Sequence, residues 1–186
     1  MNAMRYVIFD TRWGYFGLVA NGDTVYRTYL PLPDTNRIHR LLLDDIDDSA
    51  QKDKGLMRRL QERIKAYFEG ETVDFSTDPA VSLAQRSDFD RAILAACRQI
   101  GPGRTTTYSQ LSEKVGKPGA ARAVGGAMAR NPIPLIIPCH RVLRSDGTLG
   151  GFSAPGGITV KRKMLELERT VCGLEANLFA SCPVLQ

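Results

Sequence analysis

The chain has 186 residues, 43% of them hydrophobic and 24% charged, which is enough to build one packed domain or two small ones. No apolar run approaches the ~18 residues of a membrane span, and residues 1–10 lack a signal-peptide pattern, so we expect an intracellular protein, cytoplasmic or, in a eukaryote, nuclear. The net charge of +5 is modest, and the four cysteines form no Cys-x-x-Cys pair, which argues against a disulfide framework or a zinc site.

The first fifty residues predict a small antiparallel sheet followed by a surface segment. Three short runs rich in aromatic and β-branched residues cover residues 6–9, 15–20 and 24–30. Asn21-Gly22 is typical of a two-residue hairpin loop. Residues 32–50 begin with prolines and then become acidic, so we expect them to run over the surface. His39 lies in this segment, where we expect a solvated side chain without a partner.

A helix and a connector complete the first part of the chain. Apolar residues recur at helical spacing over residues 56–68, and Gly70 follows as a stop signal, so we expect this helix to pack on the sheet. Residues 71–86 form a polar connector around Asp78-Pro79, the predicted domain boundary. We therefore divide the chain into an N-terminal α/β scaffold domain, a domain that carries the chemistry and a C-terminal tail, over residues 1–80, 81–170 and 171–186.

The second predicted domain begins with helices. Ser87 is the expected N-cap of a helix that ends at Ile100. Thr107-Tyr108-Ser109-Gln110 has capping-box spacing and opens a short helix that ends at Val115. A Gly-containing turn then leads to a helix over residues 120–130. Two short helices joined by a tight turn suggest a helix-turn-helix.

The second of these two helices is unusually thin. Gly125 and Gly126 each cost roughly 1 kcal/mol against alanine in a helix interior, so their presence needs a reason. A slim helix can closely approach either a neighbouring helix or a nucleic-acid groove, and both interpretations remain open at this point. Arg122 is its one charged residue before Arg130 and would project alone from this bare face.

Cys139 stands apart from the other cysteines. Cys97 falls on the apolar face of the predicted helix 88–100 and is expected in the core. The remaining two are in the tail: Cys172 and Cys182. Cys139 is followed directly by His140 in the run Pro138-Cys139-His140-Arg141-Val142. A reactive thiol needs a group that takes its proton, because the thiolate is the nucleophile. The alternative is a buried core cysteine beside a surface histidine.

A Gly-rich loop and a helix follow the cysteine. Residues 150–157 lack the Gly-Lys-Ser/Thr of a phosphate-binding loop, so we interpret them as a lid beside Cys139. Residues 158–169 predict a helix that offers Glu166 and Glu168 as acids.

The distribution of charge indicates a polyanion partner. Residues 1–97 carry 13 Lys and Arg against 15 Asp and Glu, whereas residues 98–170 carry 12 against 4. The basic part contains Cys139. A one-sided basic domain is typical of nucleic-acid binding, although an ordinary solvated surface can carry the same charge.

Together these patterns resemble the O6-alkylguanine-DNA alkyltransferases, which are DNA-repair methyltransferases. The resemblance runs from Asp88 to Glu168, and the Pro138-Cys139-His140-Arg141-Val142 run is its most specific part. Asn131-Pro132, Arg122-Ala123-Val124-Gly125 and the Gly-rich loop follow the order of the family. The resemblance implies an α+β fold, with a ribonuclease H-like scaffold and a mostly helical domain that contains the helix-turn-helix.

The resemblance also implies a role for each matching residue. Cys139 would accept the alkyl group from O6-alkylguanine, or from O4-alkylthymine, and His140 would act through a water as its base. Glu168 would orient His140, Asn131 would brace the backbone before the cysteine, and Tyr108 would donate a proton to the guanine ring. The product is a thioether that no ordinary step reverses, so we expect one turnover per molecule.

The implied partner is double-stranded DNA, approached through the minor groove with little sequence specificity, because the thin helix lacks base-reading side chains. Arg122 would fill the gap left by the flipped base. The resemblance places further DNA contacts at Ala123, Gly125, Tyr108 and Arg141. The implied substrate pocket has five residues: Met128, Pro134, Val142, Phe152 and Ser153. We expect a monomer without cofactor or zinc and without membrane contact.

Three other functions fit parts of the sequence. The first is a non-reactive protein of the same fold that binds alkylated bases, although it would lack the accepting cysteine. The second is a cysteine hydrolase, for which the adjacent side chains of Cys139 and His140 point apart in extended chain. The third is a DNA-binding regulator, which the thin helix disfavours.

Overall fold

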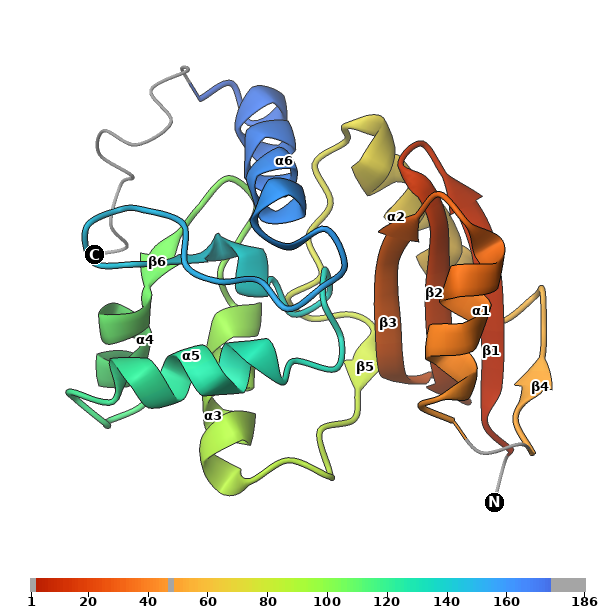
Figure 1. The fold of residues 1–186 in the computed structure, drawn as a ribbon, viewed down its shortest axis with the longest axis horizontal. Helices are drawn as coiled ribbons and strands as arrows, with labels where there is room; N and C mark the ends of the chain where they lie inside the picture. The colour runs from red at the N-terminus through yellow and green to blue at the C-terminus, as the bar shows by residue number, and fades with distance from the viewer. Residues whose placement is uncertain (1–2, 47–48, 175–186) are drawn as a thin grey trace. The chain divides into compact units, whose positions relative to one another are not determined.

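The computed structural model describes residues 3–46 and 49–174, which form two compact units. The described residues up to Val73, with Thr77–Ser82 and Pro132–Pro134, form the first unit, and Asp74–Ser76, Leu83–Asn131 and the described residues from Leu135 form the second. The fold is α+β, as predicted (Figure 1). Cys182 and most of the predicted tail lie outside the described residues. The predicted domain boundaries stay predictions.

The first unit contains a five-stranded sheet in the order β4-β1-β2-β3-β5. Its strands are β1 Arg5–Thr11, β2 Gly14–Asn21, β3 Thr24–Leu32, β4 Gln51–Lys52 and β5 Ala80–Val81. The three central strands are antiparallel, as expected, but the two short edge strands pair in parallel, so the sheet is mixed. The hairpin between β2 and β3 closes one residue later than predicted. Asn21 pairs with Thr24, and Gly22 takes a positive φ of 56° in the turn.

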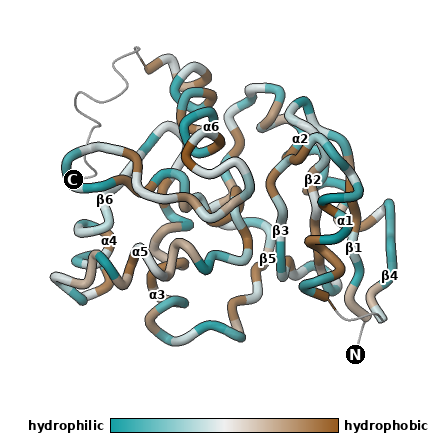
Figure 2. The backbone as a smooth tube through the Cα atoms, in the orientation of Figure 1, coloured by the Kyte–Doolittle hydropathy of each residue, from teal (hydrophilic) through white to brown (hydrophobic). Residues whose placement is uncertain are grey.

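Residues 32–50 contain a helix that the sequence analysis did not predict, α1 Thr35–Leu43. Asp34 caps its N-terminus by accepting a hydrogen bond from the Asn36 backbone N–H. Ile38 and Leu42 are buried, and hydrophobic and hydrophilic residues alternate along the helix (Figure 2). The prediction of a surface segment was wrong here because only Ile38 and Leu42 are buried along this helix, so its apolar face is short.

His39 also differs from the expectation. Its Nε2 lies 3.4 Å from the Tyr6 hydroxyl, and the two rings meet edge to face with centroids 6.1 Å apart. The side chain is half-buried and has a partner, so it is part of the packing between α1 and β1.

The two helices of the first unit cover opposite faces of the sheet. Successive residues of a strand point to opposite faces, so one strand can contact both helices. Tyr6 and Val19 pack with Leu42 of α1. Phe16 faces the other way and contacts Phe68 of α2, Arg58–Glu69, with ring centroids 6.1 Å apart. Gly70 ends α2 with a positive φ of 97°, as the stop signal predicted.

The second unit holds four helices and a short parallel strand pair. The helices are α3 Asp88–Arg98, α4 Tyr108–Lys114, α5 Ala121–Ala129 and α6 Gly157–Val171. A 3₁₀ turn, η1 Cys139–Arg141, leads into β7 Val142–Leu143, which pairs with β6 Thr106–Thr107. This pairing brings the start of α4 beside the segment that carries Cys139. Among the described residues, no helix is long and apolar enough to cross a membrane.

Two predicted helix caps in this unit are confirmed. The Ser87 side chain accepts a hydrogen bond from the Asp90 backbone N–H at the start of α3. Thr107 and Gln110 form a complete capping box, in which each side chain accepts from the backbone N–H of the other residue. The capping box fixes the first turn of α4, where Tyr108 lies.

Part of the segment between α5 and the cysteine belongs to the first unit. The Thr28 backbone N–H donates to the Pro132 carbonyl at 3.1 Å, and the Thr28 hydroxyl donates to the Pro134 carbonyl at 2.7 Å. Thr28 is buried, so these bonds are shielded from water. They hold Pro132 and Pro134 against β3.

Candidate active site

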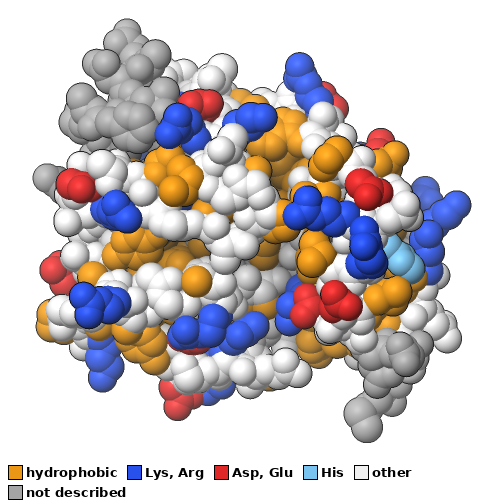
Figure 3. Space-filling view, viewed as in Figure 1, with side chains coloured by type: hydrophobic (Ala, Val, Ile, Leu, Met, Phe, Trp, Pro, Cys, Tyr) orange, Lys and Arg blue, Asp and Glu red, His pale blue; other side chains and the backbone are white. Residues whose placement is uncertain are grey.

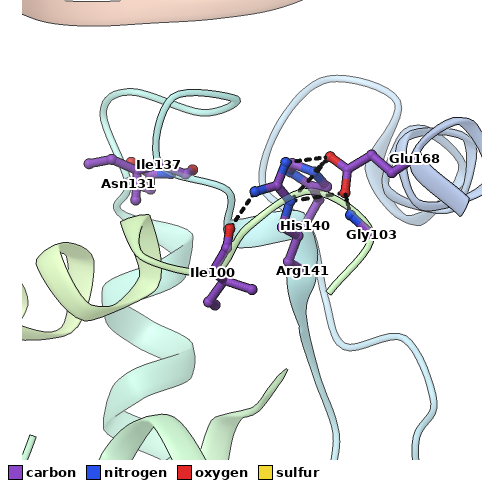
Figure 4. A network of polar contacts seen from close by, with 7 residues as sticks. All are labelled: Ile100, Gly103, Asn131, Ile137, His140, Arg141 and Glu168. Atoms are coloured by element: carbon purple, nitrogen blue, oxygen red, sulfur yellow. Dashed lines mark hydrogen bonds and ion pairs between the residues drawn. The ribbon is translucent and has the colours of Figure 1, made fainter. Parts of the chain in front are cut away.

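Cys139 begins a tight turn that hydrogen bonds hold on both sides. Its backbone N–H donates to the Ile137 carbonyl at 2.8 Å, and the Arg141 N–H donates to the Pro138 carbonyl at 2.9 Å. The Asn131 side-chain amide also donates to the Ile137 carbonyl, at 2.8 Å (Figure 4). The Asn131 side chain thus holds the backbone two residues before the cysteine.

The Cys139 thiol is 6% exposed, and burial raises its pKa. A hydrogen bond from the Asn131 side chain, the charge of Lys161 and two backbone hydrogen bonds act in the opposite direction. The thiol is therefore the favoured resting form, and the reaction must remove its proton.

His140 and Glu168 form a fully buried pair. His140 Nε2 lies 2.8 Å from Glu168 Oε1, and neither side chain is more than 3% exposed (Figure 4). Burial lowers the pKa of His140, while Glu168 opposes that shift. The imidazole is therefore neutral at rest and can accept a proton, and Glu168 would stabilise the resulting cation. Nδ1 of His140 has no hydrogen-bond partner among the described residues.

Glu168 binds Arg141 as well as His140. The Arg141 guanidinium donates from Nε and Nη2 to the carboxylate at 2.9 and 2.8 Å, and it also donates to the Ile100 carbonyl. The backbone N–H of Gly103 donates to Glu168 Oε2 at 3.3 Å. Arg141 is 3% exposed and serves as the buried counter-charge of Glu168, whereas its predicted contact with DNA stays a prediction.

An open cavity of about 880 Å³ leads to Cys139. Its lining includes seven of the predicted residues: Cys139, Tyr108, Arg122, Gly125, Met128, Phe152 and Ser153. Ala123 is exposed on α5 but is not part of this lining. The lid loop and the turn after β7 form another wall, through Gly150, Gly151, Arg144, Ser145 and Asp146.

Two predicted pocket residues do not line this cavity. Pro134 lies in the segment that Thr28 holds through its carbonyl. Val142 is fully buried in β7, and its carbonyl accepts a hydrogen bond from Lys161 Nζ at 2.6 Å. Their assignment to the substrate pocket stays a prediction.

Tyr108 reaches the cavity from the first turn of α4. Burial raises the pKa of its phenol, so the hydroxyl keeps its proton at neutral pH and can donate it. Gly150 packs directly against the ring, because a Cβ built on Gly150 would lie 2.3 Å from the Tyr108 hydroxyl oxygen. The lid loop therefore helps to fix the phenol beside the cysteine.

The thin helix α5 presents Arg122 to solvent at the edge of the cavity. A Cβ added at Gly125 would meet nothing within 4 Å, so its lack of a side chain leaves open space on the cavity side. Gly126 has a different role, because a Cβ there would lie 3.1 Å from the Arg130 guanidinium, which pairs with Asp90. On the visible face of the second unit, Lys and Arg side chains are scattered among other residues (Figure 3).

Sequence reasoning missed Lys161, which is fully buried on α6. It follows the same helical stripe as Met164, Leu165 and Glu168, all of which are buried. A lysine in an otherwise inward-facing stripe was the available signal, because lysine is almost never fully buried without a partner.

Three comparisons with known proteins identify the family of this chain. Residues 88–170 match the family model described as the DNA-binding domain of 6-O-methylguanine DNA methyltransferase. The methylated-DNA–protein-cysteine methyltransferase of Mycobacterium tuberculosis is 38% identical over 127 residues, or 68% of this chain and 74% of the relative. That of Haemophilus influenzae is 32% identical over 91% of this chain and 88% of the relative.

A solved structure extends the similarity to the fold. The crystal structure of OGT of Mycobacterium tuberculosis in complex with DNA has a TM-score of 0.74 and 33% identity, covering 94% of this chain and 98% of that one. These similarities define a DNA-repair methyltransferase with a DNA-binding domain. The chain belongs to the methylated-DNA–protein-cysteine methyltransferase family.

Proposed function

We propose that the protein repairs duplex DNA directly, by moving the alkyl group of O6-alkylguanine, and also of O4-alkylthymine, to the sulfur of Cys139. The observation that carries this proposal is the position of Cys139, which lines an open cavity and precedes the buried His140–Glu168 pair in the chain. The family supports transfer to a cysteine, while the lesions, the base flipping and the stoichiometry are part of the proposal.

The transfer is a displacement at the alkyl carbon. The thiol proton passes through a water to neutral His140, and Glu168 stabilises the imidazolium that forms. The Cys139 sulfur forms a bond to the alkyl carbon as the bond to guanine O6 breaks, and guanine leaves with that electron pair. Tyr108 donates its phenol proton to the guanine ring. Cys139 becomes a thioether, so each molecule reacts once.

The alkyl carbon lies inside the base stack, so the nucleotide must leave the duplex to reach Cys139. In this proposal α4 and α5 form a helix-turn-helix that approaches the minor groove, and the thin face of α5 with Ala123 and Gly125 permits close contact. Arg122 fills the gap left by the extruded base. Met128, Phe152 and Ser153 line the pocket that receives it. The protein acts as a monomer, and the first unit is a ribonuclease H-like scaffold.

Transfer of radiolabelled methyl tests the proposal. Duplex DNA with labelled O6-methylguanine is incubated with the protein, and the label is mapped by peptide analysis. We expect saturation at about one methyl per molecule, with the label on Cys139 and none on the Cys139→Ser variant. Repeated turnover, or label on another residue, would contradict the proposal. Tight binding of the lesion without transfer would favour a non-reactive protein that binds alkylated bases.

A second comparison tests the role of Arg122. We expect Arg122→Ala to slow repair of the duplex far more than reaction with the free O6-methylguanine base, because only the duplex requires extrusion. Arg162→Ala is the control, since Arg162 is exposed on α6. Equal losses on both substrates would remove Arg122 from the flipping step.

A further inference from the structure

Lys161 is a buried charge that the proposed reaction does not yet use. Its side chain has no exposed surface and lies on the inward face of α6, two helical turns before Glu168. Removing an ammonium group from water costs several kcal/mol unless a partner compensates it. The residues around Lys161 therefore indicate which group compensates its charge.

The direct contacts of Lys161 orient it toward the reacting groups. Its Nζ donates to the Val142 carbonyl at 2.6 Å, three residues after Cys139 in the chain. The same nitrogen lies 5.8 Å from the centre of the Tyr108 ring, within cation–π range. Lys161 thus contacts both the strand that follows the cysteine and the proposed proton donor.

No carboxylate in the described part of the chain forms an ion pair with Lys161. Glu168, on the same helix, is already bound by His140 and Arg141. A neutral carbonyl and an aromatic ring do not balance a full positive charge. The buried ammonium therefore lacks a resting counter-ion.

The titratable groups around Lys161 come from four other segments. Cys139 on η1 and Cys97 on α3 favour its charged form, whereas Arg144 in the turn after β7 opposes it. The positive charge of Lys161 also lowers the pKa of His140 on η1. Tyr108 on α4 contributes its neutral ring. Burial dominates and lowers the pKa of Lys161 to about 8, while the lysine lowers the pKa of Cys139 in turn.

We propose that Lys161 is the counter-ion of the Cys139 thiolate and a positioning residue for the alkyl transfer. This inference rests on the proposed function in so far as it takes Cys139 as the acceptor. When the thiol loses its proton, the thiolate and the ammonium form a buried pair with no net charge. When the sulfur becomes a thioether, the negative partner disappears and Lys161 is left uncompensated.

Alkylation by iodoacetamide over a range of pH tests the pair without DNA. The thiolate forms a carbon–sulfur bond, iodide leaves, and the thiol proton goes to solvent. We expect Lys161→Met to raise the pH midpoint of Cys139 alkylation by about one unit and to slow the reaction near pH 7 about tenfold. Lys161→Arg keeps a cation, so its pH midpoint of Cys139 alkylation should be close to that of the unsubstituted protein. Lys163→Met, an exposed neighbour on α6, should match the unsubstituted protein.

Peptide mapping separates Cys139 from Cys97 in this experiment. An unchanged Cys139 midpoint in a folded Lys161→Met protein would overturn the proposal, as would a shift confined to Cys97. If methyl transfer from DNA fails but the midpoint still moves, the proposed function is wrong and the ion pair stands.

A measurement on the unsubstituted protein keeps the proposal testable if the variants fail to fold. The Lys161 side chain is titrated by NMR before and after Cys139 is blocked with iodoacetamide. Because blocking removes the thiolate, we expect the Lys161 pKa to fall. An unchanged Lys161 pKa after blocking would overturn the proposal that Lys161 is the counter-ion of the Cys139 thiolate.

Discussion

Gly150 and Tyr108 are packed so closely that no side chain fits between them, since a Cβ on Gly150 would lie 2.3 Å from the tyrosine hydroxyl oxygen. The neighbouring Gly151 has nothing within 4 Å of the equivalent position. Of these two adjacent glycines, Gly151 has room for a side chain and Gly150 does not. Only Gly150 constrains the phenol.

We expect Gly150→Ala to displace the Tyr108 ring and to slow methyl transfer at least about tenfold, which corresponds to roughly 1.4 kcal/mol in the barrier. Single-turnover rates with methylated duplex DNA measure the effect. Gly151→Ala is the matched comparison in the same cavity wall and should slow transfer much less, because its added Cβ meets nothing within 4 Å. A Gly150→Ala protein as fast as the Gly151→Ala protein would mean that the position of Tyr108 is unimportant for transfer.

Glu168→Gln should be strongly destabilising, because it leaves the Arg141 cation buried without a counter-charge. Loss of one partner of a buried pair typically costs about 3–5 kcal/mol. Urea unfolding measures the free energy. Glu166→Gln is the control, since Glu166 is half-buried on the same helix, and it should change the free energy by less than about 0.5 kcal/mol. Similar effects of the two substitutions would contradict the structural role of Glu168.

Stability should fall as the protein is acidified. Burial lowers the pKa of His140 below its ordinary 6.5, and the His140 and Arg141 contacts lower the pKa of Glu168 below its ordinary 4.5. Both groups therefore bind protons more readily in the unfolded chain, and their stabilising contribution is present above those ordinary values. We expect the free energy of unfolding in urea to decrease below about pH 6.5 and more steeply below about pH 4.5. A flat profile from pH 7 to 4 would contradict these shifts.

Substitutions of Arg141 and of Arg122 should have different effects on DNA binding. Arg141→Met should lower the free energy of unfolding but leave the salt dependence of binding unchanged, because the guanidinium is bound by Glu168. Arg122→Ala should weaken binding, and a lost phosphate contact would reduce the slope of log K against log salt by about 0.9. Fluorescence anisotropy at several salt concentrations measures both. A reduced slope for Arg141→Met would return Arg141 to the DNA interface.

The elements predicted correctly are those that local sequence specifies. The Thr107–Gln110 capping box and the Ser87 cap depend on residues three positions apart, so their spacing is visible in the chain. Gly70 likewise ends α2 through its own backbone freedom. Helix α1 was missed because Pro31, Pro33 and the acidic residues hid a short apolar face of Ile38 and Leu42.

The site was only partly predictable for a related reason. Cys139, His140 and Asn131 lie within ten residues, so the resemblance located them together. The partners of Arg141 are Ile100 and Glu168, 41 and 27 residues away, and no local pattern specifies such a pair. Lys161 was missed for the same reason, since its position against Val142 depends on the packing of α6.

Helix α6 carries two buried charged residues next to the segment of Cys139, Lys161 and Glu168, which lie about 10 Å apart along its axis. During synthesis the ribosome releases Cys139 before either of them. A nascent chain that ends before α6 has its nucleophile but neither the ammonium nor the carboxylate that would activate it. The order of residues therefore means that the surroundings of Cys139 are complete only when the last helix has folded.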